Sequence, residues 1–304
     1  MKLVTFVVNG NERLGIWSEP RGILDLTAAA QSLLGRALPA DMLSFIAAGP
    51  EALKSAHEVL DAATKSPQAK WHAIASIRLA APVPHPRKNV FCVGRNYKAH
   101  IIEGARARNR EVVFPPVPEF FSKPPTAVIG HDDEVHLDTR YTRQLDYEIE
   151  LAIVIGKRCR DLSADAAMGA IFGYTIVNDV SAREVQQAHG QWFKGKGFDT
   201  YCPMGPCIVT ADEYGNPSGR RLVLTVNGET RQDSNTSDLL FGVPEIVKSL
   251  AGGMTLEPGD VIATGTPSGV ALGMTPQKWL QDGDVIVADI EGIGKLRNRV
   301  RKTF

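Results

Sequence analysis

The clearest strand in the sequence reads Asp146-Tyr147-Glu148-Ile149-Glu150-Leu151-Ala152-Ile153-Val154-Ile155-Gly156. Side chains alternate between the two faces of a strand, so Asp146, Glu148 and Glu150 are predicted to share one face. The apolar end of the segment indicates burial, and buried carboxylates need a partner. A divalent cation such as Mg²⁺, Mn²⁺ or Ca²⁺ is the simplest partner, because hard cations prefer oxygen ligands. From the spacing alone, a solvent-facing edge strand that charge protects from aggregation is the alternative.

Short β segments of this kind dominate the chain after residue 86. Valine, isoleucine and leucine are dense in them, and glycine, proline, aspartate or asparagine commonly bound them. Strands are predicted at residues 89–93, 127–129, 148–155, 171–178, 207–210, 221–226, 261–264 and 284–290. Helices are predicted only at residues 164–170 and 242–250. We therefore expect a mainly β domain over residues 86–304.

A different pattern precedes residue 80. Strands are predicted at residues 3–8 and 13–17, and helices at 24–34, 42–48 and 52–63. Three prolines then occur within residues 82–86, and proline fixes φ and lacks an N–H donor, so this segment is predicted to be a linker. The expected fold class is α+β, mainly β, with a small N-terminal α/β module over residues 1–80 and a larger domain over 86–304.

The composition excludes several classes of protein. The 304 residues contain 34 Lys plus Arg and 34 Asp plus Glu, and this zero net charge argues against a nucleic-acid partner. Apolar residues make up 43% and charged residues 22%, which is typical of a globular chain and excludes a disordered one. No apolar run approaches the roughly 20 residues that a membrane-spanning helix needs. The four cysteines form no Cys-x-x-Cys pair, and the sequence shows no secretory signal, so we expect a cytoplasmic protein with reduced thiols.

Two further features, Asp179 and the pair His100 and Glu103, each have more than one interpretation. Asp179 ends the apolar segment 171–178, where it could join the first carboxylates or, as its position alone favours, cap a following helix. His100 and Glu103 have a spacing of three, which places them on one face of a short helix. A carboxylate beside an imidazole raises its basicity and suits a general base. An ordinary surface pair is the alternative, and the local sequence favours it.

Two more segments offer polar groups to a substrate. Lys196 lies between glycines and could stabilise a developing oxyanion, although a solvated loop lysine is the simpler interpretation of that segment. Residues 264–270, which include Thr266, read Thr-Gly-Thr-Pro-Ser-Gly-Val and follow a predicted strand. Their backbone amides and hydroxyls could hold a substrate carboxylate, and an ordinary turn is the alternative.

Taken together, the order of the motifs is far more specific than any one of them. The sequence contains Gly-Arg-Asn-Tyr-x-x-His-x-x-Glu (94–103), Lys-Pro-Pro-Thr-Ala-Val-Ile-Gly (123–130), Asp-Tyr-Glu-Ile-Glu-Leu (146–151), Asn-Asp-Val-Ser-Ala-Arg-Glu-Val-Gln (178–186), Trp-Phe-Lys-Gly-Lys (192–196) and Thr-Gly-Thr-Pro-Ser-Gly-Val (264–270). This series strongly resembles the fumarylacetoacetate hydrolase family over about residues 86–300.

The resemblance implies a mixed β-roll catalytic domain and a homodimer. It implies one Mg²⁺ or Mn²⁺ ion held by Glu148, Glu150 and Asp179. The other site residues that it implies are the water-activating dyad His100 and Glu103, the catalytic Lys196, and the substrate-binding residues Arg183, Gln186 and Thr266.

The expected function is that of a metal-dependent hydrolase, which cleaves a carbon–carbon bond in acylpyruvate-like 2,4-dioxo acids of bacterial aromatic or sugar-acid catabolism. The alternatives are an isomerase or decarboxylase of 2-oxo-ene-dioates, of the 2-hydroxyhepta-2,4-diene-1,7-dioate isomerase type, and a non-catalytic metabolite-binding relative. The segment after Glu103 is longer and richer in arginine than the compact family pattern. Its Arg106, Arg108 or Arg110 could meet a second substrate carboxylate, although solvation is the favoured interpretation.

Overall fold

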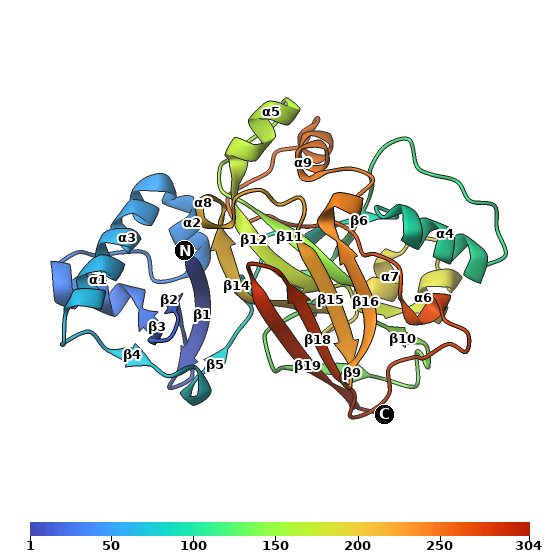
Figure 1. Ribbon diagram of the computed structural model, residues 1–304, viewed down its shortest axis with the longest axis horizontal. Helices are drawn as coiled ribbons and strands as arrows, with labels where there is room; N and C mark the ends of the chain where they lie inside the picture. The colour runs from blue at the N-terminus through green and yellow to red at the C-terminus, as the bar shows by residue number, and fades with distance from the viewer.

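The structure is a computed structural model that describes residues 1–304, and a mixed sheet of 12 strands runs through its centre (Figure 1). Strand β5 (Arg78–Leu79) pairs with β1, and β8 (Val128–Ile129) pairs with β14. The order of the other strands is β4 (Trp71–His72), β3 (Gly22–Asp25), β2 (Asn11–Ser18), β1 (Lys2–Val8), β14 (Cys202–Thr210), β12 (Ile171–Asn178), β11 (Ile149–Ile155), β17 (Val261–Ala263), β6 (Val90–Gly94) and β7 (Glu119–Lys123).

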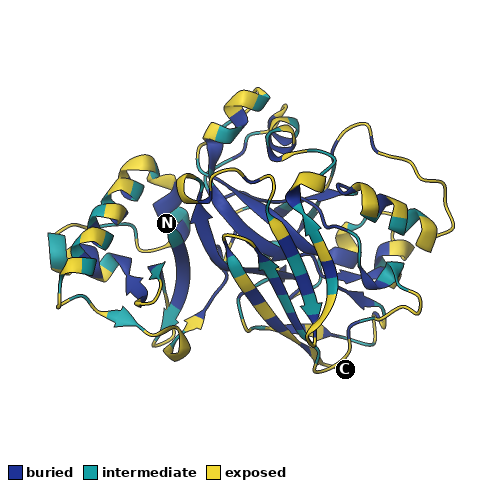
Figure 2. Ribbon diagram, viewed as in Figure 1, coloured by how far each residue is buried: buried dark blue, intermediate teal, exposed yellow.

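A second sheet of five strands covers one face of the first. Its order is β16 (Glu229–Asn235), β15 (Arg221–Val226), β18 (Val285–Ile290), β19 (Gly294–Lys302) and β9 (Glu134–Leu137). Burial alternates along β15 and β19, whereas every residue of β11 and β14 is buried (Figure 2). The larger of two apolar clusters lies between the sheets, so the α+β, mainly β fold class is confirmed.

The N-terminal residues extend the large sheet. Lys2 and Leu3 of β1 pair antiparallel with Val209 and Ile208 of β14. Helices α1 (Leu26–Leu34), α2 (Met42–Ala47) and α3 (Gly49–Lys65) pack with this part of the sheet around the second apolar cluster, at the left of Figure 1. Because one sheet runs through both parts of the chain, the division into modules 1–80 and 86–304 stays a prediction.

Most of the predicted strands and helices are present, and the differences have local causes. Strand β14 begins at Cys202, five residues before the predicted start at 207, although Pro203 and Pro206 remove two backbone donors. Strands β16 and β19 were not predicted, because their exposed positions carry charged or polar side chains. Strand β9, which begins at Glu134 in a polar segment, was not predicted for the same reason.

The remaining helices are short, and three of them cluster at the end of the molecule away from the N-terminal module (Figure 1). These three are α4 (Lys98–Ala107), α6 (Arg183–Ala188) and α7 (Phe193–Lys196). The others are α5 (Ala164–Ala167), α8 (Ala211–Tyr214) and α9 (Val243–Ala251), and a two-stranded sheet pairs β10 (Leu145–Asp146) with β13 (Ser181–Ala182). None of the helices combines the length and the apolar character that a bilayer crossing requires.

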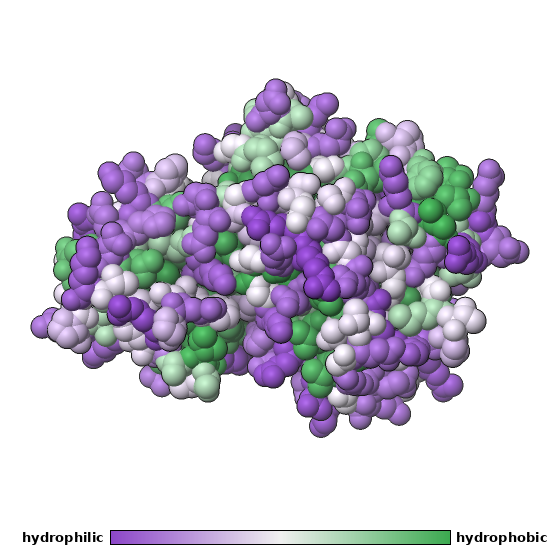
Figure 3. Space-filling view, viewed as in Figure 1, coloured by the Kyte–Doolittle hydropathy of each residue, from purple (hydrophilic) through white to green (hydrophobic).

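The face seen in Figure 3 is largely hydrophilic, and apolar side chains gather beside α4 at its upper right. Val112, Val113 and Phe114, in the segment that follows α4, are exposed. This segment borders the cavity described below, because Glu111 and Val113 line it.

Candidate metal and active site

Three carboxylates meet where the two central strands of the large sheet end. Ligand oxygens of Glu148, Glu150 and Asp179 lie within 4.8 Å of one another, and all three residues are buried. Strand pairing explains the meeting, because Ile149 of β11 lies opposite Asn178 of β12. The Asp179 backbone N–H donates to the Glu148 carbonyl at 2.8 Å, which fixes the two acids side by side. The structure therefore brings together the three residues predicted as metal ligands, here called the acidic triad.

Two local predictions about these acids were wrong. Asp146, Glu148 and Glu150 do not alternate along one uninterrupted strand, because residues 147–148 separate β10 from β11. Asp146 instead accepts from the Ala271 and Leu272 amides, at 2.8 and 3.2 Å. Asp179 does not cap a helix: the residue before α6 is Ala182, and no side chain caps it. Burial is the physical reason, since a buried Asp179 carboxylate pairs with ammonium groups instead.

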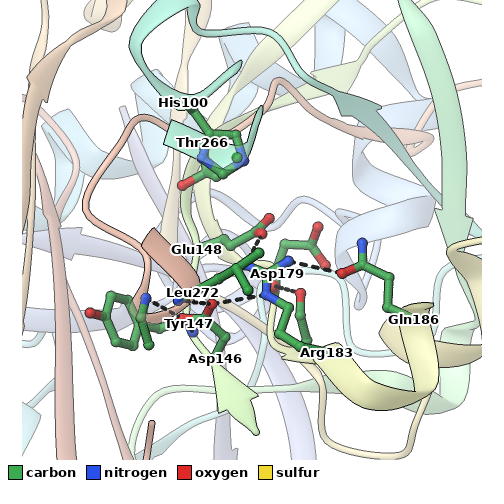
Figure 4. Close-up of polar contacts among 12 residues, drawn as sticks. His100, Asp146, Tyr147, Glu148, Asp179, Arg183, Gln186, Thr266 and Leu272 are labelled. Atoms are coloured by element: carbon green, nitrogen blue, oxygen red, sulfur yellow. Dashed lines mark hydrogen bonds and ion pairs between the residues drawn. The ribbon is translucent and has the colours of Figure 1, made fainter. Parts of the chain in front are cut away.

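Three cationic side chains surround the triad. Lys196, the last residue of α7, contacts Glu148 Oε2 at 2.8 Å and also Asp179 Oδ2. Arg183 donates from Nη2 to Glu148 Oε1 at 2.6 Å and from Nε to Asp146 Oδ2 at 2.8 Å. Both side chains are buried, so a solvated loop lysine is excluded for Lys196. Figure 4 shows Arg183 beside Asp146 and Gln186, and Gln186 Oε1 accepts from Arg183 Nη1 at 3.0 Å.

The third cation is Lys123, whose role was not predicted from the sequence. Its ammonium donates to Asp179 Oδ1 at 2.5 Å, to the Val180 carbonyl at 3.1 Å, and to the Lys196 carbonyl. The side chain is completely buried at the end of β7. The only signal in the sequence was a lysine between the aromatic residues of this strand and Pro124, and a lysine that becomes buried must meet a carboxylate.

The charges of this cluster leave Glu150 without a cationic partner. Burial raises the pKa of Glu150 well above its usual range, and the neighbouring Asp179 and Glu148 charges add to the rise. Burial would also raise the pKa of Glu148, but the Lys196 and Arg183 charges outweigh it and hold that pKa below its usual range. Glu150 accepts one hydrogen bond, from the Gly265 amide to Oε2 at 2.7 Å, and forms no ion pair.

The donor set fits a divalent cation. Four buried carboxylates, those of Asp146 and the triad, face three cationic side chains, so an ionised Glu150 would need one further positive charge beside it. Each carboxylate oxygen has two lone-pair directions, so the oxygens that already accept a bond keep capacity for an ion. An oxygen-only set of this kind suits Mg²⁺ or Mn²⁺.

Replacing Lys123 with methionine is expected to lower the free energy of unfolding of the metal-free protein by about 3 kcal/mol, because it leaves a buried carboxylate underpaired. Equilibrium urea unfolding measures the change. The matched control is Lys98→Met, at an exposed lysine of α4, which should change the stability by less than about 0.5 kcal/mol. Equal effects of the two variants would contradict the structural role given to Lys123.

The second functional group is the pair His100 and Glu103 on α4. His100 Nδ1 lies 3.2 Å from Glu103 Oε2, and the two side chains are only 17% and 16% exposed. The other Glu103 oxygen accepts from the Gly269 amide at 2.8 Å, which ties α4 to the loop 264–270. An ordinary surface pair is therefore wrong, and the helix predicted to carry the dyad is present.

The loop after β17 contributes the remaining predicted residue, Thr266. Its hydroxyl is buried at the cavity wall and accepts from Gln232 Nε2 at 2.8 Å. Gln232 Oε1 in turn accepts from the Ile149 amide at 3.0 Å, which links the loop to β11. The role of Gln232 was not predicted, since β16 was not predicted and a single glutamine does not indicate a functional site.

All of the predicted site residues except Glu103 and Asp179 line one cavity of about 440 Å³. The lining includes His100, Glu148, Glu150, Arg183, Gln186, Lys196 and Thr266. Figure 4 shows His100 facing the group of Glu148, Asp179 and Arg183 across an open space. The cavity therefore places an imidazole opposite the carboxylates of Glu148 and Glu150 and the cations Arg183 and Lys196, which suits proton transfer next to a stabilised negative charge.

Comparison with known proteins identifies the family. The model of the fumarylacetoacetate (FAA) hydrolase C-terminal domain matches residues 89–301. The chain belongs to the fumarylacetoacetate hydrolase family. Oxaloacetate tautomerase YisK of Bacillus subtilis is a member that is 40% identical over 304 residues, covering 99% of this chain and 100% of that protein.

Two solved structures of the fumarylacetoacetate hydrolase family show the same fold. The fumarylacetoacetate hydrolase of Exiguobacterium antarcticum is 40% identical and superimposes with a TM-score of 0.81, covering 99% of each chain. Maleylpyruvate hydrolase of Sphingobium sp. SYK-6, in complex with manganese(II) and pyruvate, is 32% identical with a TM-score of 0.77, again covering 99% of each chain. Members therefore carry names for different reactions, and the family by itself leaves the reaction open.

Proposed function

We propose that this protein is a divalent-metal-dependent enzyme that interconverts the enol and keto forms of a short 2-oxo dicarboxylate of the oxaloacetate class. The observation that carries the proposal is one cavity in which His100 of the dyad faces the acidic triad. The B. subtilis tautomerase supports the choice of reaction, because its likeness extends over the N-terminal module as well as the catalytic domain.

Substrate binding follows from the donors of the cavity. Glu148, Glu150 and Asp179 would hold Mg²⁺ or Mn²⁺, which as a Lewis acid draws electron density from the oxygens of a bound 2-oxo acid. Arg183 keeps two N–H groups beyond those bonded to Asp146, Glu148 and Gln186, so it can still donate to a carboxylate. The Lys196 ammonium adds a positive charge next to the position where enolate charge develops.

Proton movement is assigned to His100. With Nδ1–H donated to Glu103 Oε2, the lone pair of Nε2 is free to act as a base in the cavity. The enol O–H bond breaks and its proton moves to Nε2, after which the same nitrogen delivers a proton to the neighbouring carbon, C3. The C3–H bond forms as the C=O bond forms, so substrate and product have the same composition.

Hydrolysis of a 2,4-dioxo acid, the reaction first expected from the sequence, is the second candidate. The manganese- and pyruvate-bound maleylpyruvate hydrolase favours it, because that protein shares the fold along the whole chain. In this reaction the same dyad would take a proton from water rather than from an enol. An isomerase of a 2-oxo-ene-dioate would use the dyad in the same way, by moving a proton along a longer conjugated chain.

An ultraviolet assay separates the candidates. Freshly dissolved enol oxaloacetate should lose its enol absorbance faster with the enzyme than in buffer, and EDTA should remove the acceleration until Mn²⁺ is added back. Pyruvate release from an acylpyruvate, coupled to lactate dehydrogenase, reports hydrolysis. Pyruvate release without faster enol loss would overturn the tautomerase proposal in favour of the hydrolase.

A further inference from the structure

A smaller chamber of about 250 Å³ adjoins the main cavity at the protein surface, where five of its eight lining residues are exposed, and it is rich in side-chain donors. Its polar lining consists of Arg108, Arg110, Arg183, Gln144, Gln187 and Gln277. The two other lining residues are Ala107 and Leu272, so no carboxylate faces the chamber. A compartment lined by guanidinium and amide groups, with no acid, favours an anion.

The arginines around the site differ in whether a carboxylate already neutralises them. Arg95 forms a two-bonded pair with Glu119 at 2.7 and 2.6 Å, and Arg183 is paired with Asp146 and Glu148. Arg108 and Arg110 form no ion pair.

Arg108 in particular lacks a charged partner at the chamber wall. It makes one hydrogen bond, from Nη1 to the carbonyl of Gly104 at 3.3 Å. Arg108 is exposed, but the loss of solvent on its chamber side lowers the pKa of its guanidinium, and the nearby Arg183 and Arg110 charges lower it further. The chain that leaves the C-terminal end of α4 therefore carries positive charge, unpaired with any carboxylate, that faces the chamber.

Arg183 sets the distance between this chamber and the acidic triad. Its side chain lines both compartments, and its Nη2 lies 2.6 Å from Glu148 Oε1. One guanidinium therefore separates the triad from the donors of the chamber. An anionic group held there belongs to a ligand only a few carbon atoms long, if its other end lies against the triad.

We propose that Arg108 and Arg110, together with Gln144, Gln187 and Gln277, form a subsite for the distal carboxylate of the substrate and make the enzyme selective for dicarboxylates. This assignment rests on the proposed function, and it deepens it by naming the residues that distinguish a dicarboxylate from a monocarboxylate. The two arginines supply charge, and the three amides supply N–H donors without a competing acid.

The test compares the binding of two five-carbon 2-oxo acids to the Mn²⁺-loaded protein by titration calorimetry. The acids, 2-oxoglutarate and 2-oxopentanoate, share the 2-oxo acid end and differ in the distal carboxylate. The wild type is expected to bind 2-oxoglutarate about tenfold to a hundredfold more tightly, because hydrogen bonds to a charged group are the strong ones. The variant R108Q/R110Q should lose this preference while its Kd for 2-oxopentanoate stays unchanged.

The matched control is R106Q, since Arg106 lies in the last turn of α4, two residues before Arg108, and lines neither compartment. It should keep the preference, and Gln277→Leu should reduce it without removing any charge. A double variant that weakens both acids equally, or neither, overturns the subsite. If inorganic phosphate binds with the same Kd when 2-oxoglutarate is saturating, the chamber is an independent anion site and the proposal is also overturned.

The outcome is separable from the proposed reaction, because binding is measured without turnover. A protein that shows the dicarboxylate preference but no faster enol loss would support the subsite and contradict the proposed tautomerase activity. A protein that accelerates enol loss but lacks the preference would support the tautomerase activity and contradict the subsite.

Discussion

Replacing Glu150 with glutamine is expected to lower kcat/KM by at least about a hundredfold, which is the scale for losing even an indirect contact to a catalytic metal. The amide keeps the shape of the side chain and removes the negative charge that attracts a divalent ion. Asp179→Asn should have an effect of the same size. Steady-state rates at saturating Mn²⁺ measure both changes, whichever of the candidate reactions the enzyme performs.

The stability of the metal-free variants should move in opposite directions. The raised pKa of Glu150 means that its ionised form is unfavourable in the folded metal-free chain, so a glutamine removes this cost and should raise the melting temperature. Asp179 pairs with Lys123 and Lys196, so Asp179→Asn should lower it. The control Glu134→Gln changes an exposed carboxylate of β9 that does not line the cavity, and it should affect neither rate nor stability. A Glu150→Gln enzyme with full activity would contradict the account.

Replacing His100 with glutamine is expected to lower kcat by about 10² to 10⁴-fold, the usual contribution of a general base. Mn²⁺ affinity should stay unchanged, because His100 is not part of the acidic triad. Glu103→Gln should lower kcat less, since Glu103 acts by orienting the imidazole. Calorimetry with Mn²⁺, beside the kinetic measurement, separates a lost base from a lost metal.

Gly273 allows the same pair to be disturbed without removing either functional group. A Cβ atom at this position would overlap the Glu103 side chain. We therefore expect Gly273→Ala to displace Glu103 from His100 and to lower kcat as Glu103→Gln does. The control Gly169→Ala has open space around its Cβ and should leave kcat unchanged. Wild-type activity in Gly273→Ala would show that the position of Glu103 does not matter.

The acidic triad was predictable from the sequence because carboxylates are conspicuous in apolar strands. Glu148 and Glu150 precede and begin a fully buried strand, and Asp179 follows another. The helix of the dyad was predictable from the spacing of His100 and Glu103. The family motifs then placed these residues in one site, which local spacing alone left open.

The partners of these residues were not predictable, because they come from distant parts of the chain. Lys123 reaches Asp179 across 56 positions, and Gln232 reaches Ile149 across 83. The alternating pattern also did not predict that the strand is interrupted at residues 147–148. The reason is that Asp146 accepts a hydrogen bond from a loop amide distant in the sequence. The long-range pairing of polar groups at the ends of these central strands therefore became visible only in the structure.

The most direct measurement is a calorimetric titration of the metal-free wild type and the Glu150→Gln variant with Mn²⁺. The account predicts one Mn²⁺ bound per chain in the wild type, and loss or strong weakening of that binding in the variant. Binding of one Mn²⁺ with an unchanged Kd in Glu150→Gln, or no binding to the wild type, would contradict the assignment of the acidic triad as the metal site.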